Sequence, residues 1–161
     1  MDATHLHLVI THLPIFGSVL GMLILIYAMW RKSAATKMAA YGIFVISAIG
    51  AGIAYATGEG AEEKVEGLPG VLESIIGQHE EFAMYALISM IVLGVVSLIA
   101  MAFNGKANML SGSSAIAVLF ISLVSFGLVA KTGQLGGQIR HTEVRSGSVV
   151  QQNSAEQNDN D

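Results

Sequence analysis

The sequence predicts an all-α membrane protein, a bundle of four transmembrane helices with both termini on the outer side of the membrane. The 161 residues have a mean hydropathy of +0.61 and only 12% of them are charged, whereas soluble domains carry about 25% charged residues. The apolar residues occur in four blocks, each close to the ~20 residues that cross a ~30 Å hydrocarbon layer. Because backbone groups in lipid must be hydrogen-bonded within the chain, each block is expected to be helical.

These four blocks define one transmembrane domain over residues 1–145. The predicted spans run from about Leu6 to Trp30, Met38 to Thr57, His79 to Phe103 and Met109 to Ala130. Residues 146–161 are rich in Ser, Gln, Asn and Asp and have almost nothing to bury. This composition predicts a disordered polar tail.

The charges of the loops predict the orientation. The links after the first and third spans contain basic residues and no acidic one: Arg31, Lys32, Lys37 and Lys106. The long middle loop is acidic, with Lys64 as its single cation. An excess of Lys and Arg belongs on the cytoplasmic side, so the middle loop and both termini are expected in the periplasm. The sequence therefore predicts a multi-pass protein of the bacterial inner membrane.

Composition also excludes some classes of partner and cofactor. The net charge is −4 and no basic patch indicates nucleic acid, which leaves the lipid bilayer as the expected partner. The chain has no cysteine. Thiolate metal sites, disulfides and covalent c-type haem attachment are therefore excluded.

Pro14 allows two interpretations of the first span. It either kinks a continuous helix and leaves the carbonyl of Ile10 without its helical partner, or occupies the first turn of a helix capped near Thr11 and His12. The sequence does not choose between them.

All five histidines fall at one predicted membrane face: His5, His7, His12, His79 and His141. A rise of ~1.5 Å per residue, counted outward from the cytoplasmic stops, places His12 at about 28 Å, His7 at about 36 Å and His79 at about 39 Å. His141 projects further out, unless the glycine-rich run 133–137 bends the last helix back over the bundle. This shared depth is the main functional signal.

The facing of His79 supports an inward position. It belongs to an apolar stripe at helical spacing, made of Leu72, Ile75, Ile76, His79 and Ala83. Pro69 and Gly70 mark the start of that helix, and Glu73 and Glu80 point away from the stripe.

Imidazoles at similar depth on facing helices suit b-type haem, whose ligands usually have their second nitrogen held by a carboxylate or carbonyl. His7 and His79 match best in depth, and His12 or His141 is the alternative for either position. Two cations are the expected partners of the haem propionates: Arg140 and Lys131. Haem with two axial histidines has no open position, so this version predicts an electron carrier rather than a stand-alone enzyme.

Two alternatives stay open. A non-haem Cu, Zn or Fe site would use the same histidines with nearby carboxylates. Its candidate acidic ligands are Glu59, Glu63 and Glu80. In the other alternative, the protein is a structural subunit or interaction module of a membrane complex, and its histidines only anchor the interface.

Several motifs resemble those of small bacterial four-span membrane proteins of unknown function. They are HLH at 5–7 with THLPI at 11–15, TGEGAEE at 57–63, GLPG at 67–70 and HEE at 79–81. The run GQLGGQ at 133–138, followed by Arg140 and His141, resembles a broader four-span domain of unknown function whose motifs are HPxxVHFPI and GWLGG. The resemblance covers about residues 5 to 145.

The resemblance implies that His7, His12 and His141 occupy motif positions of both groups, and His79 a position of the closer group. The chain departs from the pattern at Thr11 for Asn, Leu13 for Phe, Gly60 for Pro and Gly67 for His. Domains of the broader type occur beside cytochrome c modules in some bacterial proteins. This association implies a redox role, with a periplasmic cytochrome c or a larger respiratory complex as partner.

Overall fold

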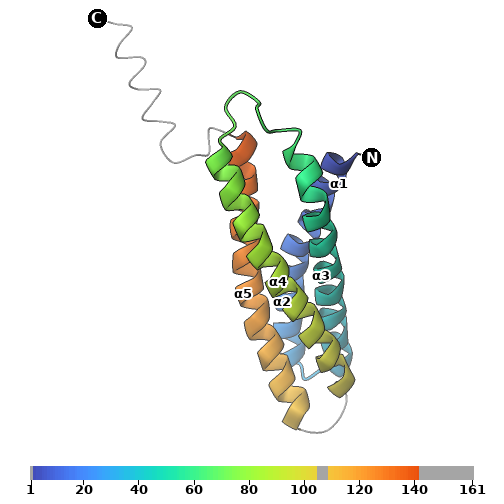
Figure 1. The fold of residues 1–161 in the computed structure, drawn as a ribbon. Coiled ribbons are helices and arrows are strands. Elements are labelled where there is room, and N and C mark those ends of the chain that lie inside the picture. Colours follow the sequence, from blue (N-terminus) through green and yellow to red (C-terminus); the bar gives the residue numbers. More distant parts are fainter. Residues whose placement is uncertain (1, 105–108, 142–161) are drawn as a thin grey trace, which may run out of the picture.

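The computed structural model describes residues 2–104 and 109–141, and within these residues all regular structure is helical. The helices are α1 (Ala3–Ile10), α2 (His12–Trp30), α3 (Ala34–Glu62), α4 (Glu73–Phe103) and α5 (Met109–Arg140). They form an elongated bundle in which successive long helices run in opposite directions (Figure 1). The predicted polar tail lies outside the described residues.

Four helices are long and apolar enough to cross a membrane, with α1 and α2 together making the first: Thr4–Trp30, Ala34–Glu62, Glu73–Phe103 and Gly112–Arg140. The predicted four-helix class is confirmed to this extent. The helices are longer than the predicted spans because a helix does not stop at the edge of an apolar block. At the histidine end, the end that holds α1 and the α3–α4 loop, α3 continues past Thr57 to Glu62. There α4 begins at Glu73, before His79.

The first span is kinked. Thr11 separates α1 from α2 but keeps a right-handed helical backbone (φ −61°, ψ −25°), and its N–H donates to the carbonyl of His7. Its side chain makes no cap for α2 and donates instead to the carbonyl of Leu8. Pro14, buried in α2, supplies no N–H to the carbonyl of Ile10. The structure therefore agrees with a kinked, nearly continuous helix.

Glycines let α2 approach α3 closely. A Cβ on Gly21 would lie 2.5 Å from the ring of Phe44, and one on Gly17 would overlap the side chain of Ser47. This is the small-xxx-small spacing that brings transmembrane helices together.

Burial is arranged as expected for a bundle in lipid. The fully buried large side chains include Tyr41, Phe44, Met90 and Leu93. Five serines are also fully buried: Ser18, Ser47, Ser97, Ser122 and Ser125. Many large aliphatic and aromatic residues face outward instead, Leu20 and Phe120 among them. Small and hydroxyl residues inside, with apolar residues outside, fit a bundle that packs in hydrocarbon.

At the histidine end the helices pack as two pairs. At the histidine end α1 packs on α3, and α4 packs on α5. Figure 1 shows these two pairs side by side at that end, with the α3–α4 loop passing from one to the other. The arrangement places His7 and His79 on different pairs.

Candidate histidine site

His7 projects from α1 onto α3. Its Nδ1 lies 2.8 Å from the carbonyl oxygen of Ala54, and the hydroxyl of Thr57 lies 3.4 Å from the same nitrogen. That hydroxyl already donates to carbonyls of its own helix, including that of Ala54. The ring passes Gly58, where a Cβ would lie 3.7 Å from the imidazole Cε1. His7 thus contacts the carbonyl of one residue and the glycine four residues later.

His79 projects from α4 onto α5 in the same manner. Its Nδ1 lies 3.0 Å from the carbonyl oxygen of Thr132. The glycine four residues later is Gly136, and a Cβ there would lie 3.0 Å from the imidazole Cε1. We call this pairing of a carbonyl with a glycine at i+4 a carbonyl–glycine seat. The chain has two: Ala54 with Gly58 for His7, and Thr132 with Gly136 for His79.

The carbonyl–glycine seats determine which nitrogen of each imidazole carries the proton and which one is available as a ligand. A carbonyl only accepts hydrogen bonds, so each Nδ1 must donate its proton. In the neutral ring the Nε2 lone pair is then available as a ligand or an acceptor. Among the described residues neither Nε2 has a hydrogen-bond partner.

The apolar stripe predicted around His79 is largely confirmed. Ile76 is buried and His79 is half-buried, facing α5. Leu72 is exposed, because it occupies the N-cap position, before the first turn of α4. Glu73 and Glu80 are exposed, and both line a cavity together with Ile76.

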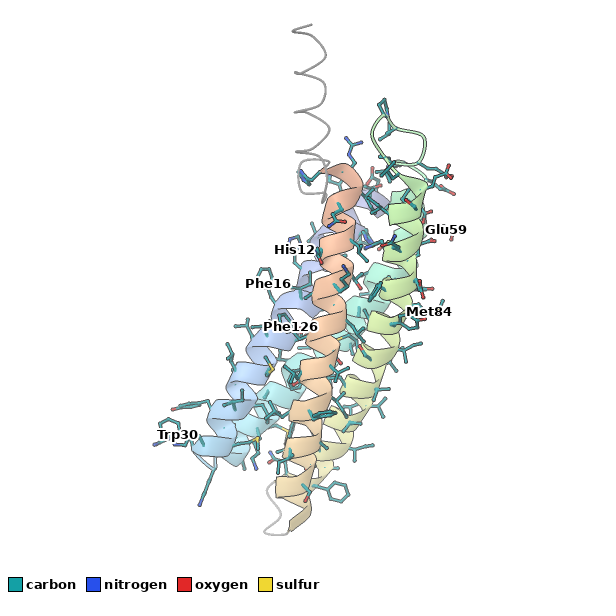
Figure 2. The ribbon with its side chains drawn as sticks, turned by 90° about the vertical axis from the view of Figure 1, so that its left-hand side faces the viewer. His12, Phe16, Trp30, Glu59, Met84 and Phe126 are labelled. Atoms are coloured by element: carbon teal, nitrogen blue, oxygen red, sulfur yellow. The ribbon has the colours of Figure 1, made fainter. Side chains whose placement is uncertain are left out.

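His12 is directed away from the two seats. It is exposed, its Nδ1 lies 2.8 Å from the carbonyl oxygen of Leu8 on its own span, and its ring stacks beside Phe16 with centroids 6.1 Å apart. Figure 2 shows His12 and Phe16 along one edge of the bundle and Glu59 on the opposite edge. The structure therefore does not bring His12 and Glu59 together.

The remaining predicted residues lie at the helix ends. Arg140 is the exposed last residue of α5, and the N–H of His141 donates to the carbonyl of Gly137. The glycine-rich run therefore does not bend α5 back over the bundle. Glu63 is exposed at the C-cap of α3. His5 is exposed and pairs with Asp2 at the start of α1.

The carboxylate that meets Glu80 is Glu62. The two carboxyl groups lie next to each other between α3 and α4. Beside them lies a cavity of about 190 Å³ lined by Glu62, Glu66, Glu73, Ile76, Gly77 and Glu80. Glu62 belongs to the same acidic run as Glu59 and Glu63, and no spacing within that run singled it out.

An ion pair ties α1 to the end of α3. Lys64 Nζ lies 2.6 Å from Asp2 Oδ2, and Asp2 Oδ1 accepts the N–H of His5, capping α1. The ammonium of Lys64 holds the pKa of Asp2 well below its usual range. Thr4 adds a bond to the carbonyl of Gly60, at 3.4 Å. These contacts support the position of His7, one turn further along.

Comparison with known proteins adds no relative: no family model, curated protein or solved structure matches the chain. The class is therefore defined by the fold and the site. The protein is a helical bundle with four helices of membrane-spanning length and apolarity, carrying two imidazoles in matching carbonyl–glycine seats at one end.

Proposed function

We propose that this is a multi-pass protein of the bacterial inner membrane that binds haem b through His7 and His79 and transfers electrons at the periplasmic face. The observation that supports the proposal is the matched pair of carbonyl–glycine seats. Haem-ligating histidines are usually oriented by a hydrogen bond from the second ring nitrogen to a carbonyl or carboxylate. Both seats provide this bond, from helices that belong to different pairs.

The donor set favours haem over a non-haem ion. A structural or catalytic non-haem site needs three or more protein ligands. Within residues 2–104 and 109–141, no three His, Asp or Glu side chains gather in a way that would hold one ion. Haem brings four equatorial nitrogens and needs only two imidazoles from the chain. His12, His141, Glu59 and Glu63 are therefore not required.

Other side chains near the two histidines would have roles in binding haem. Arg140, exposed one turn after Gly136 on α5, is the cation that would hold a propionate, whereas Lys131 bonds Gln134 of its own helix. Leu135, buried on α5 next to Gly136, would limit the access of water to the imidazole of His79, whereas Ile76 lines the cavity among the glutamates. Glu62 and Glu80 place two neighbouring carboxyl groups beside His79.

Haem held by the imidazoles of His7 and His79 would supply reversible one-electron transfer and would leave no position for a substrate. The chain positions the Nε2 atoms and limits water access, which tunes the potential through burial and hydrogen bonding. The partners we propose are the quinone pool on one side and a periplasmic cytochrome c or a larger respiratory complex on the other.

A structural role is the second candidate. Each imidazole already bonds a carbonyl on a neighbouring helix, so the two histidines also act as clamps between α1 and α3 and between α4 and α5. A structural subunit or interaction module needs nothing more from them.

The visible spectrum of the purified protein tests these candidates. A Soret band with sharp reduced α and β bands supports the haem proposal. A colourless protein with a stoichiometric metal ion supports the Cu, Zn or Fe version. A folded protein without pigment or metal supports the structural one.

Histidine variants test the ligand assignment, and this is our first residue-level prediction. His79→Ala and His7→Ala should each abolish the haem spectrum while the protein still inserts, because four apolar helices drive insertion. His5→Ala, His12→Ala and Glu73→Gln should keep it, since these side chains are exposed away from the seats. Retained pigment in His79→Ala would remove that residue from the site.

A further inference from the structure

A second surface runs along α2, from beside His12 to the opposite end of the bundle. Exposed apolar residues follow one face of this helix at helical spacing: Phe16, Leu20, Leu23, Tyr27 and Trp30. Trp30 is 75% exposed and ends the stripe. Figure 2 shows Trp30 at the far end of the same edge that carries His12 and Phe16. The stripe is long enough to accompany an acyl chain.

Two cations follow directly where the stripe ends. Arg31 is exposed, with its guanidinium carbon 5.9 Å from the centre of the Trp30 ring. Lys32 is exposed and has a left-handed backbone, φ 52°. Left-handed positions after a helix are usually glycine or asparagine, so a lysine there adds charge at a conformational cost. The turn thus presents two positive groups beside an exposed indole.

This positive charge is not balanced nearby. In the described part of the chain every carboxylate belongs to residue 2 or to residues 59–81, at or near the histidine end. Arg31 and Lys32 therefore present positive charge to whatever lies against α2. An amphipathic ligand with a negative head and an apolar tail matches both parts of this surface.

We propose that this surface binds an anionic phospholipid. Arg31 and Lys32 contact the phosphate of the headgroup, Trp30 lies at the level of the ester groups, and the acyl chains run along Tyr27, Leu23 and Leu20. Tryptophan beside cations is the side-chain combination found where a helix leaves the hydrocarbon. A second copy of this chain is a poorer occupant in a parallel arrangement, because its own Arg31 and Lys32 would bring like charges together.

Trp30 makes the test direct, because it is the only tryptophan of the chain. The intact protein is reconstituted in vesicles of phosphatidylcholine. A growing fraction of brominated phosphatidylglycerol, or of brominated phosphatidylcholine, is then added, with the bromines near the headgroup. Bromine quenches indole fluorescence only at short range. We expect phosphatidylglycerol to quench at a lower mole fraction, and the difference to shrink as salt is raised.

Variants test whether Arg31 and Lys32 cause the preference for phosphatidylglycerol. A Lys or Arg at a membrane surface contributes roughly fivefold to affinity for anionic lipid, so Arg31→Gln with Lys32→Gln should weaken that affinity about 25-fold. Lys64→Gln with Lys131→Gln removes the same charge from the histidine end and should leave the preference intact. Arg31→Lys with Lys32→Arg keeps both charges and should also preserve it.

Three outcomes would overturn the proposal. Equal quenching by the two lipids in the wild-type protein would show that no anionic lipid is selected. This measurement does not depend on any variant folding. A preference that survives Arg31→Gln with Lys32→Gln, in a protein with unchanged circular dichroism, would place the selectivity elsewhere. Loss of the preference in inorganic phosphate, but not in sodium chloride of equal ionic strength, would indicate a site for free phosphate.

Discussion

At the scale of single residues, His7 and His79 each reach a backbone carbonyl of a neighbouring helix, and a glycine follows each carbonyl by four residues. A helical carbonyl is normally covered by the side chain of the residue one turn further on. Gly136 removes that cover where the ring of His79 lies closest, 3.0 Å from the place of a Cβ, whereas a Cβ at Gly58 would lie at an ordinary contact distance of 3.7 Å from His7. The same solution appears twice, on helices of different pairs.

Gly136 gives the residue-scale test of a seat. In Gly136→Ala the new Cβ would lie 3.0 Å from Cε1 and 3.3 Å from Nδ1 of His79, so the ring must shift and its bond to Thr132 must lengthen. We expect haem occupancy to fall several-fold and stability to fall by about 1 kcal/mol relative to the control. The control is Gly137→Ala, where a Cβ meets nothing within 4 Å. Both variants gain the same helix propensity, so equal haem titrations and unfolding curves would contradict the seat.

At the scale of elements, the kink before Pro14 places α1 against α3. A straight first span would carry α1 along the axis of α2, whereas the kinked span lets α1 pack on α3. The contacts of Asp2 and Thr4 with residues 64 and 60 then hold α1 in place. The position of His7 therefore depends on the geometry of a whole helix.

Pro14→Ala tests this dependence. Alanine restores an N–H to the carbonyl of Ile10 and favours a straight helix. We expect helix content by circular dichroism to be kept or to rise, while haem binding measured by titration decreases. Pro69→Ala, in the exposed α3–α4 loop, is the matched control and should bind as the wild type does. Unchanged haem affinity in Pro14→Ala would separate the kink from the site.

Close packing of α2 on α3 gives a second element-scale prediction. In Gly21→Ala the Cβ would lie 2.5 Å from the ring of Phe44, which is fully buried and has little room to move. We expect a loss of about 2 kcal/mol in the free energy of unfolding, the usual cost of overpacking. Gly52→Ala, whose Cβ meets nothing within 4 Å, should be neutral or slightly stabilising. Denaturation in detergent micelles compares the two, and equal midpoints would argue against close packing at Gly21.

At the scale of the whole molecule, charge separates the two ends of the bundle. The described carboxylates belong to the half with the histidines, whereas Arg31, Lys32 and Lys37 lie at the other end. Lys and Arg accumulate on the cytoplasmic side of membrane proteins. The bundle is therefore expected to insert with its histidine end in the periplasm.

Reporter fusions test the orientation. A C-terminal alkaline phosphatase should be active, because this enzyme matures only in the periplasm. A C-terminal green fluorescent protein should be dark, because it becomes fluorescent only when it folds in the cytoplasm and not after export in an unfolded state. Fusions truncated after Lys32 should give the opposite pattern. A fluorescent C-terminal fusion would overturn the topology, and the periplasmic placement of the histidines with it.

The sequence alone determined the number of helices, their approximate spans and the inward position of His79. These properties depend on local composition and on the helical period, which any stretch of chain carries within itself. Depth counting also placed His7 and His79 at one level, on helices that the structure puts in different pairs.

Only the tertiary structure decided which atoms these residues meet. It turned His12 outward, paired Glu80 with Glu62 rather than Glu59 or Glu63, and gave each seated imidazole a carbonyl four residues before a glycine. Such choices depend on the rotation and axial register of each helix against its neighbours. Contacts between helices set both quantities, such as Gly21 on Phe44 and Gly94 on Ala48, and a period of 3.6 residues does not specify them.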